Sequence, residues 1–218
     1  MNGSTKEIND KSRDGYELAI QALNNLKELN YNRTCINWVM HSFNADDFEN
    51  IISLAESYNV KSIAVMMFKP DKSHNLPSVP SKEQILKVSK VIRNYKGKIQ
   101  LEIEECFSQM RAVVGERFLI NYNTGLSRGC GAGRDGFSVS VDGYLTPCRH
   151  LYTMKEKFSN ISDYWNQSPI LKELRTTEDR IDKPCSNCRY KRNCLPCMAV
   201  VWNFNNRLIM RDDKCPFA

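Results

Sequence analysis

The sequence lacks the marks of a membrane protein or a secreted protein. No apolar run approaches the roughly 20 residues that a membrane-spanning helix needs. The polar start of the chain contains no hydrophobic stretch of the kind that a secretory signal peptide carries. We therefore expect no membrane partner, and we expect the protein to work in the cytoplasm, where thiols stay reduced.

Histidine and clustered positive charge are scarce as well. The 3 histidines are His41, His74 and His150, and they are isolated from one another. The formal net charge is +6, but no block contains more than two adjacent basic residues. Because nucleic-acid binding depends on basic side chains gathered into a patch, the sequence argues against it. We expect a surface position for His150, although it follows Cys148 closely.

Cysteine, by contrast, is plentiful. An odd count of 9 with two CxxC pairs fits metal binding in a reducing compartment better than an extracellular disulfide framework. Cys35 and Cys106 fall on predicted strands, so we expect them to be buried like small hydrophobic residues. The other seven lie in the second half of the chain, at Cys130, Cys148, Cys185, Cys188, Cys194, Cys197 and Cys215.

Residues 1–107 alternate between helical and strand patterns. The spacing of apolar residues predicts helices at 16–30, 44–58 and 81–95. Asn44 is expected to cap the second helix, and Ser81 with Gln84 makes a capping-box pattern at the third. Runs of β-forming residues predict strands at 34–40, 62–68 and 99–107. This alternation predicts an α/β fold with a parallel sheet.

A sheet of three strands is incomplete, because an edge and a face stay uncovered. We therefore expect either a missing N-terminal part or a partner that covers the sheet, and the abrupt start just before a helix fits a fragment. The first helix is expected to bury one apolar face, made of Tyr16, Ala19, Ile20, Leu23 and Leu26.

The pattern changes after residue 107. Residues 108–129 have no clear periodicity and are expected to be a connection. FSVSV followed by Asp142 and Gly143 predicts a β-hairpin, and residues 160–175 predict a turn and a helix. AVVWNF, the pair Asn205 and Asn206, and RLIM together predict a second hairpin.

The cysteine spacing favours iron–sulfur clusters, which need several thiolates presented by loops. Cys185, Cys188, Cys194 and Cys197 alone suit one tetrahedral zinc ion. Structural zinc modules, however, usually place about 12–20 residues between their CxxC pairs, whereas five residues separate them here. A zinc site would also leave three cysteines unexplained. Zinc, and free or redox-active thiols, nevertheless stay open as alternatives.

Residues 129–218 resemble the SPASM domain of radical S-adenosylmethionine (SAM) enzymes. In the family pattern a cysteine is followed by a glycine and a second cysteine, which here are Cys130, Gly143 and Cys148. Twelve residues separate Cys130 from Gly143, and the four residues YLTP separate Gly143 from Cys148. The five later cysteines match the rest of the pattern. FSVSVDGYLTPC, SNISDYW and the terminal KCPF are also typical of the family. The chain departs from it at Cys194 and Cys197, which are separated by two residues instead of three.

The resemblance implies two auxiliary [4Fe-4S] clusters with interleaved ligands. Auxiliary cluster I would take Cys130, Cys148 and Cys197, and auxiliary cluster II would take Cys185, Cys188, Cys194 and Cys215. Some family members have a further cysteine shortly before the first one, but NYNTGLSRG contains none here. One iron of cluster I is therefore expected to be open to a substrate group such as a thiolate, or filled by water or by Cys106.

Residues 1–107 resemble the second half of the radical SAM partial (β/α) barrel, with its fourth to sixth strands. The resemblance implies a barrel part at 1–110, a linker at 111–128 and a SPASM auxiliary-cluster domain at 129–218. The CxxxCxxC motif that binds the SAM-cleaving cluster does not occur in this sequence. We therefore expect no SAM cleavage by this chain alone, and we assign no catalytic or SAM-binding residue.

The function implied is that of the C-terminal part of a radical SAM/SPASM maturase, an oxidoreductase that modifies a peptide or protein. SAM and a third [4Fe-4S] cluster would belong to a complete chain, with a flavodoxin or ferredoxin as electron donor. Two auxiliary clusters would lower the net charge to about +3. The alternatives are a non-catalytic iron–sulfur protein for electron transfer or peptide binding, and a zinc-binding module.

Overall fold

Three parallel strands form the sheet of the N-terminal half, as predicted. They are β1 (Cys35–Met40), β2 (Ser62–Met67) and β3 (Gln100–Ile103), and β2 lies between the other two. Trp38 pairs with Val65, which pairs with Ile103 on its other side. The third strand ends earlier than predicted, because the chain turns after Glu104 with a hydrogen bond from Phe107 N to Glu104 O (2.9 Å).

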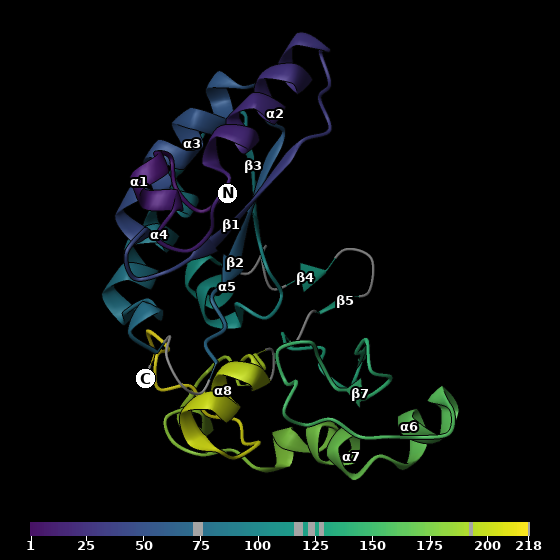
Figure 1. Cartoon of the computed structure of the whole chain (residues 1–218). Coiled ribbons are helices and arrows are strands. Elements are labelled where there is room, and N and C mark those ends of the chain that lie inside the picture. Colours follow the sequence, from purple (N-terminus) through teal and green to yellow (C-terminus); the bar gives the residue numbers. More distant parts are fainter. Residues whose placement is uncertain (72–75, 116–119, 122–124, 127–128, 192–193, 218) are drawn as a thin grey trace.

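This computed structural model describes residues 1–71, 76–115, 120–121, 125–126, 129–191 and 194–217. His74 lies outside them. In Figure 1 the α/β part is drawn in purple to teal, and a part with few strands, in green to yellow, lies below it. Within the described residues, no helix combines the length and the apolar character that crossing a bilayer requires.

Two helices, α3 (Phe48–Ser57) and α4 (Lys82–Asn94), cover one face of the sheet. The other helices of this half are α1 (Lys6–Asn9), α2 (Tyr16–Glu28), η1 (Ala45–Asp47) and η2 (Leu76–Ser78). In Figure 1, α3 and α4 run along the same side of the strands. Their apolar faces pack on the sheet, and the rings of Trp38 and Phe48 lie 4.7 Å apart in the centre of this core.

The opposite face of the sheet is largely open. Along β1, burial alternates, and Cys35 and Asn37 are exposed. The prediction that Cys35 is buried is therefore wrong, because Cys35 begins an edge strand and points to the uncovered face. The buried face predicted for α2 is also wrong: the helix has no buried residue, and of its five apolar positions only Leu23 packs against the core.

Two helix starts were predicted from capping residues, and one is confirmed. Ser81 Oγ accepts from Gln84 N (3.3 Å), and Gln84 Oε1 accepts from Ser81 N (2.9 Å). Asn44, however, does not cap α3, because the short helix η1 intervenes. Its side chain accepts instead from His41 N (2.7 Å) and donates to the carbonyl groups of Asn2 and Val39.

Replacing Ser81 by alanine is expected to lower the free energy of unfolding by about 1 kcal/mol. The substitution leaves the amide of Gln84 without its acceptor at the start of α4. Ser53→Ala is the matched control, because its hydroxyl lies on an exposed face and only donates to Glu49 O. Urea unfolding followed by circular dichroism measures both. Equal losses in the two variants would contradict the capping role.

The second half of the chain is built from short elements. They are α5 (Ser108–Val114), β4 (Ile120–Asn121), β5 (Gly125–Leu126), β6 (Ser138–Val139), β7 (Leu145–Thr146), α6 (Ile161–Gln167), α7 (Pro169–Arg175), η4 (Thr177–Asp179), η5 (Cys185–Asn187) and α8 (Met198–Asn205). The strands β6 and β7 pair in antiparallel fashion around Asp142 and Gly143, which confirms the first predicted hairpin.

The second predicted hairpin is wrong, because the run AVVWNF forms helix α8. Asn206 adopts a left-handed conformation (φ 53°), and its amide donates to Trp202 O (2.8 Å). The asparagine pair therefore ends a helix instead of turning a hairpin. Short apolar runs do not distinguish a buried strand from a buried helix, and α8 is buried from Met198 to Val201.

Helix α5 was not predicted either. All of its residues except Val113 are buried, and they include Ser108, Gln109 and Arg111. A helix that is buried on most of its sides has no amphipathic pattern to show in the sequence. The helix runs across the boundary expected between residues 110 and 111, and much of the expected linker at 111–128 lies outside the described residues. The domain boundaries stay a prediction.

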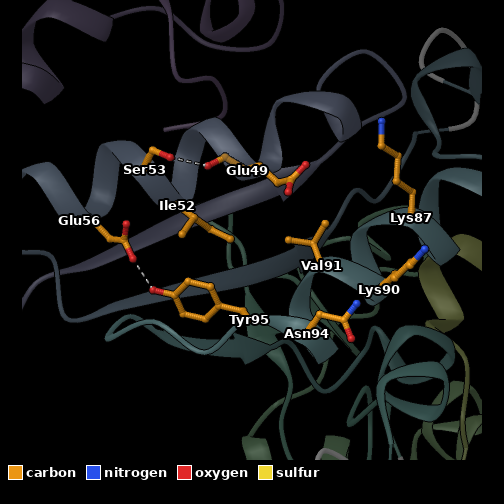
Figure 2. Close-up of a pocket in the computed structure, with 9 residues that line it drawn as sticks. All are labelled: Glu49, Ile52, Ser53, Glu56, Lys87, Lys90, Val91, Asn94 and Tyr95. Atoms are coloured by element: carbon orange, nitrogen blue, oxygen red, sulfur yellow. Dashed lines mark hydrogen bonds between the residues drawn. The ribbon is translucent and has the colours of Figure 1, made fainter.

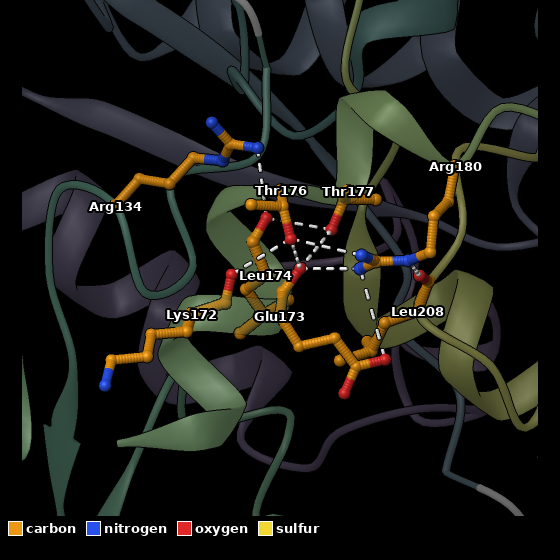
Figure 3. Close-up of polar contacts among 8 residues, drawn as sticks. All are labelled: Arg134, Lys172, Glu173, Leu174, Thr176, Thr177, Arg180 and Leu208. Atoms are coloured by element: carbon orange, nitrogen blue, oxygen red, sulfur yellow. Dashed lines mark hydrogen bonds and ion pairs between the residues drawn. The ribbon is translucent and has the colours of Figure 1, made fainter. Parts of the chain in front are cut away.

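Arginine side chains hold the end of α7 against its neighbours (Figure 3). The Arg134 guanidinium donates to Leu174 O (3.0 Å), and that of Arg180 donates to Glu173 O (2.6 Å) and Leu208 O (3.2 Å). Cations suit the last turn of a helix, where carbonyl groups lack partners. These bonds join the loop after Cys130, α7 and the segment after α8.

Candidate metal centres

Three cysteines from distant segments meet between the two halves of the chain. The sulfur atoms of Cys106, Cys130 and Cys197 all lie within 4.8 Å of one another. No other group of three metal-ligating side chains is this tight in the part of the chain that the structure describes. Hydrogen bonds from Cys106 and Cys197 hold the pKa of Cys130 well below its usual range.

Backbone pairing brings Cys130 and Cys197 together. Gly129 forms a parallel bridge with Leu195, and Cys130 N donates to Leu195 O (3.1 Å). Gly129 has a φ of +110°, and a Cβ atom there would lie 2.2 Å from Leu195 O, so only glycine fits. Met198 N then donates to the sulfur of Cys130 (3.5 Å) at the start of α8.

Cys106 lies in the turn after β3 and is half-buried, not on a strand as predicted. An ion pair fixes the start of this turn: Lys69 Nζ lies 2.7 Å from Glu104 Oε2, and the same oxygen accepts from Met67 N (3.0 Å). Burial acts to lower the pKa of Lys69, but Glu104 and the neighbouring thiol of Cys197 more than offset it.

Cys148 is half-buried and does not belong to the tight group of three. Its segment is nevertheless tied to that of Cys130, since Gly133 N donates to Pro147 O (3.2 Å). His150 is half-buried, so the expected surface position holds only in part. Burial, with the positive charge of Lys69, lowers the pKa of His150 to about 4.

The other four predicted ligands line one cavity. They are Cys185, Cys188, Cys194 and Cys215, and Gln109 and Ala112 of α5 also line it. The thiol of Cys194 donates to Ser108 Oγ (3.2 Å). Burial raises the pKa of Cys194 and of Cys215 to about 12. Such thiols ionise when a bound cation replaces their protons, as metal ligands do.

A buried carboxyl group lines the same cavity. Burial raises the pKa of Asp212 to about 6. Its Oδ1 accepts from Lys214 N (2.9 Å), but its Oδ2 is buried without a hydrogen-bond partner among the described residues. Buried polar atoms are nearly always satisfied. The orphaned oxygen and the four thiols therefore fit a cavity that receives a metal group.

Cys194 and Cys197 diverge although only two residues separate them. Cys194 belongs to the cavity with Cys185, whereas Cys197 contacts Cys130, and the backbone of Leu195 lies between them. The structure thus gathers six of the seven predicted ligands into two groups that interleave along the chain, and Cys148 belongs to neither. Their roles as ligands stay predictions. The sequence did not single out Asp212 for this site, nor Ser108 and Gln109, which lie on the unpredicted helix α5.

A separate groove lies between α3 and α4 (Figure 2). It is lined by polar and charged side chains such as Glu49, Lys87 and Lys90, and Glu56 Oε1 accepts from the hydroxyl group of Tyr95 (2.7 Å). Among the described residues that line the groove there is neither cysteine nor histidine. We assign no chemistry to it.

Comparison with known families identifies the region of the cysteines. Residues 130–189 match the model of SPASM, an iron-sulfur cluster-binding domain. The chain therefore contains a SPASM domain, which confirms the resemblance seen in its sequence. No curated protein matches the chain in sequence.

Solved structures of SuiB from Streptococcus suis share the fold. The match has a TM-score of 0.64 and 15% identity for SuiB itself, covering 90% of this chain and 49% of that one. SuiB bound to S-adenosylmethionine and SuiB bound to precursor peptide SuiA both match with a TM-score of 0.63 and 14% identity, and both matches cover 90% of this chain. The matches cover 48% of the first of those chains and 47% of the second. The predicted fold class is confirmed. The chain spans about half the length of these structures.

Proposed function

We propose that this SPASM-containing chain is the C-terminal part of a radical SAM/SPASM maturase, and that it holds two auxiliary [4Fe-4S] clusters. The observation that carries the proposal is the division of the cysteines into two groups, both of which include cysteines of residues 130–189, the part that matches an iron-sulfur family. One group lines a buried cavity, and the other lies between the two halves of the chain. Iron–sulfur clusters take thiolates presented in this manner from separate loops.

The proposed ligand assignment follows the two groups, with Cys148 added. Cys185, Cys188, Cys194 and Cys215 would hold auxiliary cluster II, while Cys130 and Cys197, together with Cys148, would hold auxiliary cluster I. Bound there, the clusters would supply electron acceptance during the modification of the substrate. The protein contributes their burial and nearby charges, which set the reduction potential.

The proposed substrate is a peptide or protein. It is supported by the shared fold with SuiB, which has been solved with its precursor peptide SuiA. SAM and a third [4Fe-4S] cluster would act elsewhere in a complete enzyme, because the sequence has no CxxxCxxC motif. A flavodoxin or ferredoxin would deliver electrons. All 9 cysteines are free of disulfide bonds, which suits the reducing cytoplasm.

Metal analysis of the chain tests this proposal. After anaerobic purification and reconstitution, we expect about eight irons and about eight sulfides per chain, as two [4Fe-4S] clusters require. Visible and electron paramagnetic resonance (EPR) spectra should show the clusters in oxidised and reduced protein. Bound zinc without sulfide would overturn the proposal.

Zinc remains the second candidate because one observation favours it. Thiolates about 2.3 Å from a tetrahedral zinc ion lie about 3.8 Å from one another. The three sulfur atoms within 4.8 Å approach that spacing. In that case the chain would be a zinc-stabilised module, and added sulfide would not bind. The measured ratio of sulfide to metal separates the two candidates.

The absent CxxxCxxC motif favours a third candidate, a non-catalytic iron–sulfur protein for electron transfer or peptide binding. It shares the two clusters with the first proposal. The two differ in whether SAM is cleaved when this chain is tested within a complete enzyme.

A further inference from the structure

We propose that Cys106 is the fourth ligand of the first cluster, so that Cys106, Cys130, Cys148 and Cys197 hold it together and leave no iron open. The inference rests on the proposed function, which places a cluster at this site. Cys106 lies outside residues 130–189 and outside the spacing pattern of the other seven cysteines. Its assignment comes from the tertiary structure.

The side chain of Cys106 points toward two other cysteines. A cysteine that merely fills the core places its sulfur among apolar atoms. The sulfur of Cys106 instead lies within 4.8 Å of the sulfur atoms of both Cys130 and Cys197. Two of these three thiols are already predicted ligands, so the third points at the same metal site.

The backbone around Cys106 holds this position firmly. Glu104 N donates to Val65 O (3.0 Å) at the end of the sheet, and its carboxylate is paired with Lys69, whose side chain is only 5% exposed. The turn closes with the bond from Phe107 N to Glu104 O. A ligand on such an anchored turn is preorganised, whereas a ligand on a long free loop is not.

The fourth thiol comes from the segment after the β6–β7 hairpin. Cys148 follows Pro147, whose carbonyl is bonded to Gly133 in the loop after Cys130. Three thiols thus meet at one site, and Cys148 lies on a segment that is bonded to one of theirs. A cluster there would join the sheet to the loop-rich half.

A closed cluster has a different role from an open one. With four thiolates bound, no iron can take a thiolate or an amine of the substrate, so this cluster would pass electrons only. Each thiol that binds iron loses its proton, and the core of charge +2 with four thiolates carries about −2. The buried ammonium group of Lys69 is paired with Glu104, two residues before Cys106, and would offset part of this charge.

The test compares Cys106→Ala and Cys106→Ser with Cys35→Ala in the full chain, reconstituted without oxygen. Cys35 is exposed at the start of β1 and is the matched control. In the unaltered chain and in the control, we expect added cyanide to leave the EPR spectrum of the reduced clusters unchanged. In both Cys106 variants we expect cyanide to shift it, and brief oxidation to release about one of about eight irons.

The outcomes separate this inference from the proposed function. If cyanide shifts the spectrum of the unaltered chain, and the Cys106 variants behave like the control, the first cluster is open and the inference is wrong, while the two clusters stand. If Cys130→Ala keeps as much iron as the unaltered chain, no cluster occupies this site and both fail. If the Cys106 variants do not fold, the cyanide measurement on the unaltered chain still shows whether the first cluster has an open iron, and an open iron would overturn the inference.

Discussion

Replacing Cys194 by alanine is expected to reduce the iron content from about eight to about four atoms per chain, the loss of one [4Fe-4S] cluster. Cys194 lines the cavity with Cys185, Cys188 and Cys215, and it lies in the interior next to Ser108. No other cysteine lines that cavity, so an alanine there leaves the cluster one thiolate short. Iron and sulfide analysis with EPR of the reduced protein measures the loss.

Two further variants make the result specific. Cys35→Ala should keep all of the iron, because Cys35 is exposed on β1. Cys130→Ala should remove a cluster with a different EPR signal, and the double variant of Cys130 and Cys194 should bind almost no iron. If the variants at Cys130 and Cys194 remove the same signal, the two groups of thiols hold a single metal site, and the two-cluster assignment fails.

Replacing Phe48 by alanine is expected to lower the free energy of unfolding by about 3–5 kcal/mol. Phe48 is 1% exposed at the start of α3 and packs against Trp38 of β1. The substitution removes a ring at the point where the helical layer meets the sheet, and the close-packed surroundings relax only partly into the space.

Leu29→Ala is the control for this prediction. Leu29 is 76% exposed at the end of α2, so its substitution should change the free energy of unfolding by less than about 0.5 kcal/mol. Urea unfolding followed by far-ultraviolet circular dichroism measures both variants. A loss below about 1 kcal/mol for Phe48→Ala would show that the packing of α3 on the sheet contributes little to stability.

Much of the N-terminal half could be predicted from local patterns. The helices and strands alternate as expected, and the capping box at Ser81 is present. These features depend on residues only a few positions apart, so a sequence shows them directly. The failed predictions at Asn44 and Cys35 concern partners and exposure, which neighbouring segments decide.

The helices of the second half were harder to predict. Both α5 and α8 are buried on most of their sides, so their residues lack the polar face that marks an ordinary surface helix. The run in α8 is also short and rich in β-branched valine, which favours a strand in isolation. Packing between the two halves decided in favour of helix.

The sequence by itself determined the kind of chemistry, because the spacing of seven cysteines and their resemblance to a SPASM domain point to iron–sulfur binding. Only the tertiary structure decided which thiols meet. Leu195 separates Cys194 from Cys197, and the turn after β3 carries Cys106 to Cys130. The physical reason is that a metal site is a meeting of side chains in space, and the sheet that positions Cys106 lies far along the chain from the loops that position its partners.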